Sequence, residues 1–232
     1  MTLTGTGGIG KTVVGRLVTE AIAESLDPVQ AVWSCDLQAI RDGAGLVRAL
    51  AKTVGVAARP GRASDDIERV AKVLAGAGPS LLFLDNLEHL LEPAADVLSR
   101  LMVGAPEARF LVTSRRVLGH PREHIYPLEP LDKEAARELF IAAARRKNFH
   151  FEVHPSDLND LDAIVSALDA IPLAIELAAA QSRTLSCREL SERLSRDAAL
   201  PGVPQPREAT RSATLRGAIE SSWQLLSYEE RL

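Results

Sequence analysis

The residues with the clearest chemistry lie near the start of the chain, from Gly5 to Thr12. Their letters, GTGGIGKT, match the phosphate-loop pattern G-x-x-x-x-G-K-[ST] at every fixed position. The glycines allow backbone N–H groups to approach a polyphosphate closely. We expect Lys11 to place a positive charge between the β- and γ-phosphates and the Thr12 hydroxyl to bind Mg²⁺. A helix beginning here would point its positive end at the anion.

The same segment also contains G-x-G-x-x-G at residues 5–10, a pattern typical of dinucleotide-binding folds. Asp36, near the end of the next apolar run, would then be a candidate partner for a ribose. Lys11 and Thr12 favour the phosphate loop, because a dinucleotide fold needs neither a cation nor a metal-binding hydroxyl at these positions.

A candidate metal ligand, Asp85, follows the apolar run Leu81–Leu84. Large apolar residues without alternation are typical of a strand covered on both faces, as in the middle of a parallel sheet. Ligands of open α/β sheets bind outside the carboxyl ends of the strands. We therefore expect Asp85 to hold Mg²⁺ through water, together with Thr12. The alternative is that Asp85 only caps the next helix.

The residue after the magnesium aspartate is often a second acid that aligns water, but here it is Asn86, which cannot act as a base. Glu88 is the nearest substitute and a catalytic candidate. It is also compatible with a plain role in the first turn of a helix, where the helix dipole favours an acid. The sequence therefore predicts slow hydrolysis.

A candidate phosphate sensor follows the apolar run Phe110–Thr113, which predicts another buried strand. The polar residues Ser114, Arg115 and Arg116 come directly after it. A cation at this strand end would face the γ-phosphate position and report whether it is occupied. We expect Arg115 to make this contact and Arg116 to face outward, the alternative being a solvated basic pair.

Strand and helix patterns alternate through residues 1–130, which predicts an α/β fold of the P-loop NTPase type with a parallel sheet flanked by helices. Short apolar runs predict strands at residues 2–4, 31–33, 81–84, 110–113 and 124–128. Helical periodicity predicts helices at residues 11–25, 46–54 and 91–103, and another that starts at a cap in residues 64–66.

The rest of the chain has only helical patterns. Residues 131–195 predict an all-α helical lid domain, in which Pro172 stands at the first turn of a small-residue helix. Residues 196–213 form a predicted linker, because three prolines fall within residues 201–206. Residues 214–232 then predict the start of a truncated winged-helix domain.

Composition excludes several classes of protein. Charged residues make up 25% and hydrophobic residues 46% of the 232 residues, which argues against disorder. The net charge of -4 gives no basic surface for direct nucleic-acid contact, and no apolar run approaches the length of a membrane span. Cys35 and Cys187 are far apart, so we expect reduced thiols and a cytoplasmic location. Met1 lies so close to Gly5 that we expect a segment of a longer protein.

Taken together, these motifs resemble the nucleotide-binding module of the STAND class of signal-transduction ATPases, an NB-ARC-like group that includes bacterial transcriptional regulators. The resemblance covers essentially the whole chain. It is carried by the phosphate loop, the segments 81–89 and 111–115, the Ala-Ile-Pro-Leu-Ala run at 170–174, and the start of the predicted winged helix.

The resemblance implies a switch that binds ATP or ADP with Mg²⁺ and keeps ADP tightly bound at rest. Arg115 would be its first sensor, and Pro172 would pack against the adenine or ribose. The pattern also departs from the family, because Ala170-Ile171 replaces the usual glycine before the leucine-proline pair. The predicted nucleotide-contacting residues are Gly5, Gly7, Gly8, Ile9, Gly10, Lys11, Thr12, Val13, Arg115 and Pro172.

Family likeness further implies partner domains outside this segment, namely an effector domain, often DNA-binding, before it and helical sensor repeats after it. It also implies a possible homo-oligomer in the ATP-bound state. The alternatives are a faster P-loop ATPase or phosphotransferase with a separate substrate, a dinucleotide oxidoreductase, and a passive scaffold with a degenerate site.

Overall fold

The computed structural model describes residues 1–25, 29, 31–59 and 61–198. The chain divides into two units, Met1–Leu128 and Glu129–Leu232, and each is described by itself. The predicted start of a winged helix, residues 214–232, and most of the predicted linker lie outside the described residues.

The first unit is built on a five-stranded parallel sheet with the order β2-β3-β4-β1-β5. The short strand β1 pairs with β4 on one side and β5 on the other. Because all strands are parallel, their carboxyl ends share one edge of the sheet. The strands are β1 (Thr2–Thr4), β2 (Ala31–Asp36), β3 (Ser80–Asp85), β4 (Ala108–Ser114) and β5 (Ile125–Pro127).

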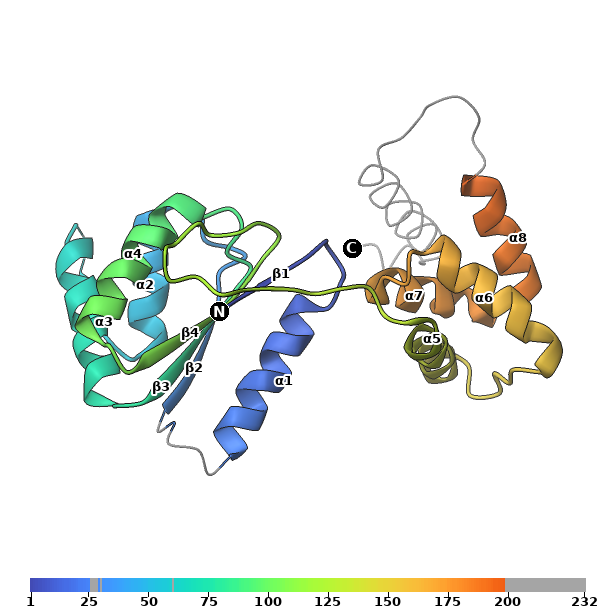
Figure 1. The fold of residues 1–232 in the computed structure, drawn as a ribbon, viewed down its shortest axis with the longest axis horizontal. Helices are drawn as coiled ribbons and strands as arrows, with labels where there is room; N and C mark the ends of the chain where they lie inside the picture. Colours follow the sequence, from blue (N-terminus) through green and yellow to red (C-terminus); the bar gives the residue numbers. More distant parts are fainter. Residues whose placement is uncertain (26–28, 30, 60, 199–232) are drawn as a thin grey trace. The chain divides into compact units, whose positions relative to one another are not determined.

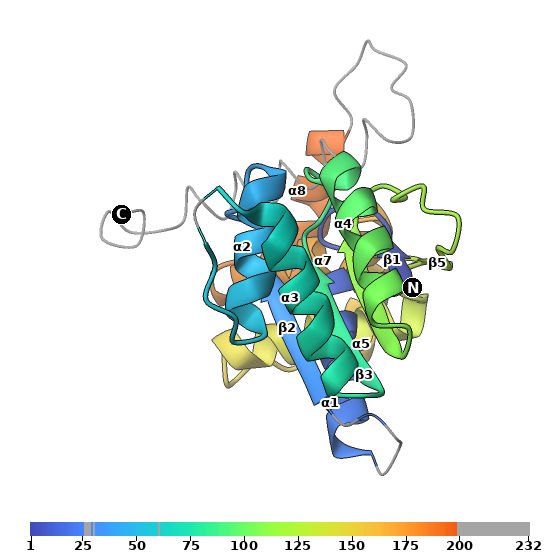
Figure 2. The same ribbon diagram turned by 90° about the vertical axis from the view of Figure 1, so that its left-hand side faces the viewer.

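Helices cover both faces of this sheet (Figure 1): α1 lies on one face, and α2, α3 and α4 lie on the other. Figure 2 views the second face, where α3 runs between α2 and α4. The helices are α1 (Lys11–Glu24), α2 (Gly43–Thr53), α3 (Ala63–Gly76) and α4 (Leu91–Gly104). This confirms the predicted parallel α/β architecture of the P-loop type.

Strand β3 shows why its sequence is apolar throughout. Side chains alternate across a strand, so Leu82 and Leu84 pack into the core under α2, α3 and α4. Leu81 and Phe83 point the other way and pack in a smaller cluster with Val14 of α1. The strand is therefore buried on both faces and can end on a functional carboxylate at the sheet edge.

The strand order excludes the dinucleotide interpretation. A dinucleotide-binding fold places its second strand beside its first. Here β3 and β4 lie between β1 and β2. Asp36, at the end of β2, is therefore separated from the glycine loop by two strands. A residue that binds the ribose of a dinucleotide would lie on the strand next to the loop.

Two local expectations were wrong. The strand predicted as buried at 31–33 runs on to Asp36 and is only partly buried, because β2 is an edge strand paired with β3 alone. Helix α3 begins at Ala63, before the predicted cap. Asp66 lies inside its first turn, fully buried, where it accepts a 2.7 Å hydrogen bond from the Arg59 N–H and pairs with Arg69.

The described part of the second unit is entirely helical, and its helices enclose a separate core around Phe140, Ile164 and Ile175. Asp132 caps α5 by accepting a 2.8 Å hydrogen bond from the Ala135 N–H. The helices are α5 (Lys133–Lys147), α6 (Leu158–Ala167), α7 (Pro172–Ala179) and α8 (Cys187–Ala198), with 3-10 turns at Pro155–Asp157 and Ala180–Arg183. Helix α8 thus continues into the predicted linker.

Among the described residues, no helix combines the length and the apolar character that crossing a bilayer requires.

Candidate nucleotide-binding site

The glycine loop connects the end of β1 to the first turn of α1. Gly8 and Gly10 adopt left-handed backbone angles, with φ of 78° and 101°, which explains why glycine is needed at both positions. Gly10 is the N-cap of α1 and has no side chain to satisfy the first N–H groups of the helix. These N–H groups remain available to an anion at the carboxyl edge of the sheet.

Lys11 folds back over the loop that precedes it. Its Nζ donates hydrogen bonds to the carbonyl oxygens of Gly5 and Thr6, at 2.8 and 2.9 Å. Burial lowers the pKa of Lys11, and the negative charge of Glu88 opposes this shift. Phosphate oxygens would give the ammonium group charged partners in place of these neutral carbonyls.

Asp85 and Thr12, the predicted metal pair, are in direct contact. Asp85 is buried at the end of β3, where its Oδ1 accepts a 2.9 Å hydrogen bond from the Thr12 hydroxyl. A hydroxyl and a carboxylate are the oxygen donors that Mg²⁺ takes beside water and phosphate. The two side chains therefore fit the metal that usually accompanies a nucleoside triphosphate.

Thr113 is a part of the site that the sequence did not reveal. It is buried at the end of β4, beside β3, and its hydroxyl donates to the same Oδ1 of Asp85. The hydroxyl oxygen also accepts a 2.9 Å hydrogen bond from the backbone N–H of Asn86. The signal in the sequence was a hydroxyl residue directly after the apolar run 110–112, near the carboxyl end of the strand.

Asn86 has a conformational role in place of the missing second acid. Its φ of 62° is left-handed, a region that asparagine tolerates better than most residues. Its side-chain amide donates to Asp36 Oδ1 at 3.4 Å, and Asp36 also accepts from the Gln38 N–H. Directly after this turn, Leu87 is fully buried in the core.

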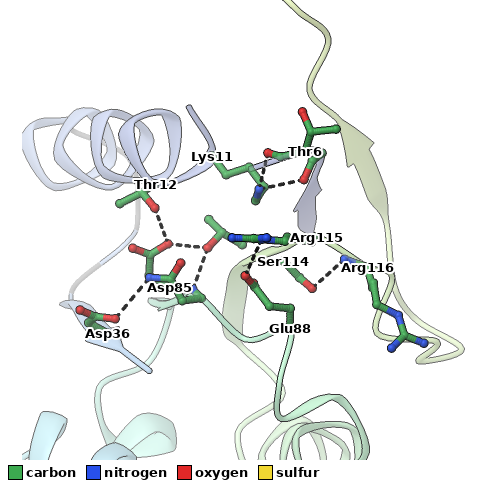
Figure 3. A network of polar contacts seen from close by, with 12 residues as sticks. Thr6, Lys11, Thr12, Asp36, Asp85, Glu88, Ser114, Arg115 and Arg116 are labelled. Atoms are coloured by element: carbon green, nitrogen blue, oxygen red, sulfur yellow. Dashed lines mark hydrogen bonds and ion pairs between the residues drawn. The ribbon is translucent and has the colours of Figure 1, made fainter. Parts of the chain in front are cut away.

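Glu88 and Arg115 meet beside the loop (Figure 3), with 3.2 Å between Glu88 Oε1 and Arg115 Nε. The guanidinium group also lies against the loop backbone, because a Cβ added to Gly7 would be 3.5 Å from Arg115 Cζ. Arg116 points away from this group and is exposed. Its backbone N–H donates to Ser114 Oγ at 3.1 Å.

The structure thus brings the glycine loop, Asp85, Glu88 and Arg115 together in the first unit. Ile9 is buried, and a Cβ on Gly5 would lie 3.0 Å from its side chain. Val13 is largely exposed on α1. Pro172, the remaining predicted contact, is the first residue of α7 in the second unit.

This strand order, with a glycine loop after β1 and a carboxylate at the end of β3, defines a P-loop nucleotide-binding domain. In agreement, residues 1–113 match the family model described as an AAA domain. This part of the chain is therefore similar to AAA-type P-loop ATPase domains.

A relative from Mycobacterium tuberculosis, named as a predicted HTH-type transcriptional regulator, is 33% identical over the whole of this chain. The chain covers only 26% of that relative, so it spans about a quarter of the relative's length.

Two solved structures share the fold at low sequence identity. Drosophila ORC bound to DNA superposes with a TM-score of 0.59 at 16% identity, covering 98% of this chain and 62% of the other. A STAND protein with a tetratricopeptide repeat sensor from Pyrococcus horikoshii gives a TM-score of 0.51 at 14% identity, covering 98% and 30%. At such identities the likeness concerns the fold alone.

Proposed function

We propose that this chain is the ATP/ADP-dependent switch module of a bacterial transcriptional regulator of the STAND type, with slow ATP hydrolysis. The observation that carries the proposal is the convergence of three groups. Arg115 lies against the glycine loop, and the loop's Thr12 is hydrogen-bonded to Asp85. One triphosphate and one Mg²⁺ ion can reach all of them.

The switch would work through differential contacts with the γ-phosphate. Thr12 and Asp85 would hold Mg²⁺, while Lys11 and Arg115 would bind the γ-phosphate of ATP. ADP lacks this group and cannot engage Arg115. In this proposal the helical unit acts as a lid whose orientation follows the bound nucleotide, with Pro172 against the adenine or ribose.

The proposal extends beyond this segment to an effector domain, which would bind DNA, to sensor repeats, and to a possible homo-oligomer in the ATP state. The support for a regulatory role is the name of the mycobacterial relative and the resemblance of the motifs. A cytoplasmic location is favoured by Cys35 and Cys187, which are both buried and unpaired.

Slow hydrolysis is the expected consequence of the local geometry. Asn86 occupies the position of the usual second acid and is held in a turn by Thr113 and Asp36. Glu88, the nearest other acid, lies three residues after Asp85 instead of directly after it, and it is paired with Arg115 before ATP binds. A faster ATPase or phosphotransferase would need a free base and an acceptor site.

The test is to identify the nucleotide carried by freshly purified protein and to measure steady-state turnover with Mg²⁺. We expect bound ADP and a turnover well below about 1 per second. The Lys11→Ala variant is the control and should carry no nucleotide. Sustained turnover well above about 1 per second would favour the enzyme instead. Absence of any bound or binding nucleotide would favour the passive scaffold.

A further inference from the structure

Arg115, the predicted phosphate sensor, is paired with an acid, Glu88, which sensing of a phosphate does not by itself require. Its Nε contacts Glu88 Oε1 at 3.2 Å while its guanidinium group lies against Gly7 of the loop. Its side chain is 65% exposed, whereas that of Glu88 is 24% exposed. The arginine can therefore move, and the glutamate is held in a more enclosed position.

Glu88 depends on this arginine for its charge balance. Among the described residues, its second carboxylate oxygen, Oε2, is buried and accepts no hydrogen bond. A buried carboxylate oxygen without a donor is costly, and Arg115 is the one ion-pair partner of Glu88 among the described residues.

We propose that Arg115 exchanges partners: it pairs with Glu88 while no γ-phosphate is present and shifts to the γ-phosphate when ATP binds. This inference rests on the proposed function. The departure of Arg115 leaves Glu88 free to act on water, so that the step that senses ATP also releases the base for its hydrolysis.

The reaction that follows balances without another reactant. The water oxygen bonds to the γ-phosphorus as the bond from that phosphorus to the β,γ-bridging oxygen breaks. ADP leaves with that oxygen, and the proton of the water passes to Glu88 and then to solvent. Arg115 returns to Glu88 once phosphate departs.

If Glu88 and the γ-phosphate compete for Arg115, nucleotide binding should change in a way that a purely catalytic role of Glu88 does not predict. If Glu88 competes with the γ-phosphate for Arg115, removing its charge must strengthen ATP binding relative to ADP. A base that only accepts a proton from water would affect turnover and leave this ratio unchanged. The ratio of the two dissociation constants therefore reports the exchange directly.

The experiment uses the nucleotide-stripped 232-residue chain and titration calorimetry with Mg²⁺. The probes are ADP and a non-hydrolysable β,γ-imido analogue of ATP. We expect Glu88→Gln to raise the preference for the analogue over ADP by about two- to fivefold, the range of a partly exposed ion pair. Turnover of ATP should fall in the same variant. Glu88→Ala is the second variant and should shift the ratio in the same direction.

A double-mutant cycle assigns the effect to the arginine. In an Arg115→Ala background, Glu88→Gln should leave the ratio unchanged. Glu92→Gln, which removes an exposed acid from the first turn of α4, is the matched control and should have no effect. Partial loss of folded protein cancels, because both nucleotides are compared on the same preparation.

The outcomes separate the two proposals. An unchanged ratio in Glu88→Gln, or the same change without Arg115, would overturn the exchange while nucleotide binding itself stands. Failure of the unmodified chain to bind either nucleotide would instead remove the proposed function, and the exchange with it.

Discussion

At the scale of single residues, the site depends on a few hydrogen bonds that orient buried charge. Asp85 is held by two hydroxyl groups from different elements, Thr12 of α1 and Thr113 of β4. The second hydroxyl also holds the backbone of Asn86. The position of this carboxylate is therefore determined by its neighbours in space.

Replacing Thr113 by valine tests this arrangement, because valine keeps the shape and removes the hydroxyl. Asp85 loses a donor and the Asn86 N–H loses an acceptor, so we expect a loss of about 1–3 kcal/mol in the free energy of unfolding. The Mg²⁺ dependence of ADP binding should weaken as well. Denaturant unfolding and calorimetry measure the two effects.

Thr113→Ser is the control, since it retains the hydroxyl, and it should keep most of the Mg²⁺ dependence. If valine and serine behave alike in both measurements, Thr113 does not orient Asp85.

Ala170 carries a second residue-scale prediction. Its φ of 52° is left-handed, a conformation that costs a residue with a Cβ about 1–2 kcal/mol. This explains why glycine is usual at the position in the resembling family. We expect Ala170→Gly to stabilise the chain by about 0.5–1 kcal/mol, measured by denaturant unfolding.

The matched control is Ala163→Gly within α6, which should destabilise by about 1 kcal/mol because glycine disfavours a helix. Two changes of the same sign would contradict the backbone argument.

At the scale of elements, close packing of α1 on the sheet positions the start of the phosphate loop helix. Gly15 is buried in α1, and a Cβ on it would lie 2.5 Å from the ring of Phe83. The ring is fully buried and packs in a cluster with Leu3, Leu81 and Leu111. Helix and strand can approach this closely only because Gly15 has no side chain.

Gly15→Ala should therefore destabilise the first unit. Overpacking costs about 1–3 kcal/mol, which a gain in helix propensity of about 1 kcal/mol offsets only in part. Gly76→Ala is the matched control, since a Cβ there meets nothing within 4 Å and the change should be neutral or favourable. Thermal unfolding of the two variants would contradict the argument if Gly15→Ala were the more stable.

The ion pairs between α5 and α6 lead to a prediction about the pH dependence of stability. Hydrogen bonds from Arg137 and Lys133 lower the pKa of Asp162 from 3.8 to about 2. The folded-state pKa lies below the unfolded value, so this group contributes stability above pH 3.8 that is lost as pH falls toward 2.

Asp162→Asn should lower the free energy of unfolding by a constant amount between pH 5 and 7, a window above both pKa values, and should remove that part of its decline between pH 4 and 2. Unfolding followed by circular dichroism over this range measures it. If the free energy of unfolding falls equally steeply between pH 4 and 2 in the variant and the unmodified chain, the ion pairs of Asp162 do not contribute to stability.

At the scale of the whole molecule, the chain combines a sheet domain that carries the candidate site with a helical unit that has its own core. Two separate cores allow each unit to keep its structure while their arrangement changes, which a nucleotide-dependent switch requires. In the proposal, Pro172 links the helical unit to the nucleotide, and its role stays a prediction.

Much of the first unit could be predicted from sequence because the signals are local. The glycine loop is a contiguous pattern, and the apolar run before Asp85 reflects burial on both faces of one strand. Element boundaries were less accurate. The start of α3 was missed because Asp66, which looked like part of a cap, is instead paired inside the helix.

The sequence by itself determined the nature of the candidate site, because a phosphate loop needs its glycines, lysine and threonine at fixed spacing along one short segment. Only the tertiary structure decided which strands are neighbours, and this strand order excludes the dinucleotide fold. The tertiary structure also decided two contacts, the hydrogen bond from Thr113 to Asp85 and the ion pair of Glu88 with Arg115. These contacts join residues from separate elements, and such pairings depend on how the strands and loops meet at one edge of the sheet. No local pattern along the chain specifies which of these elements come into contact.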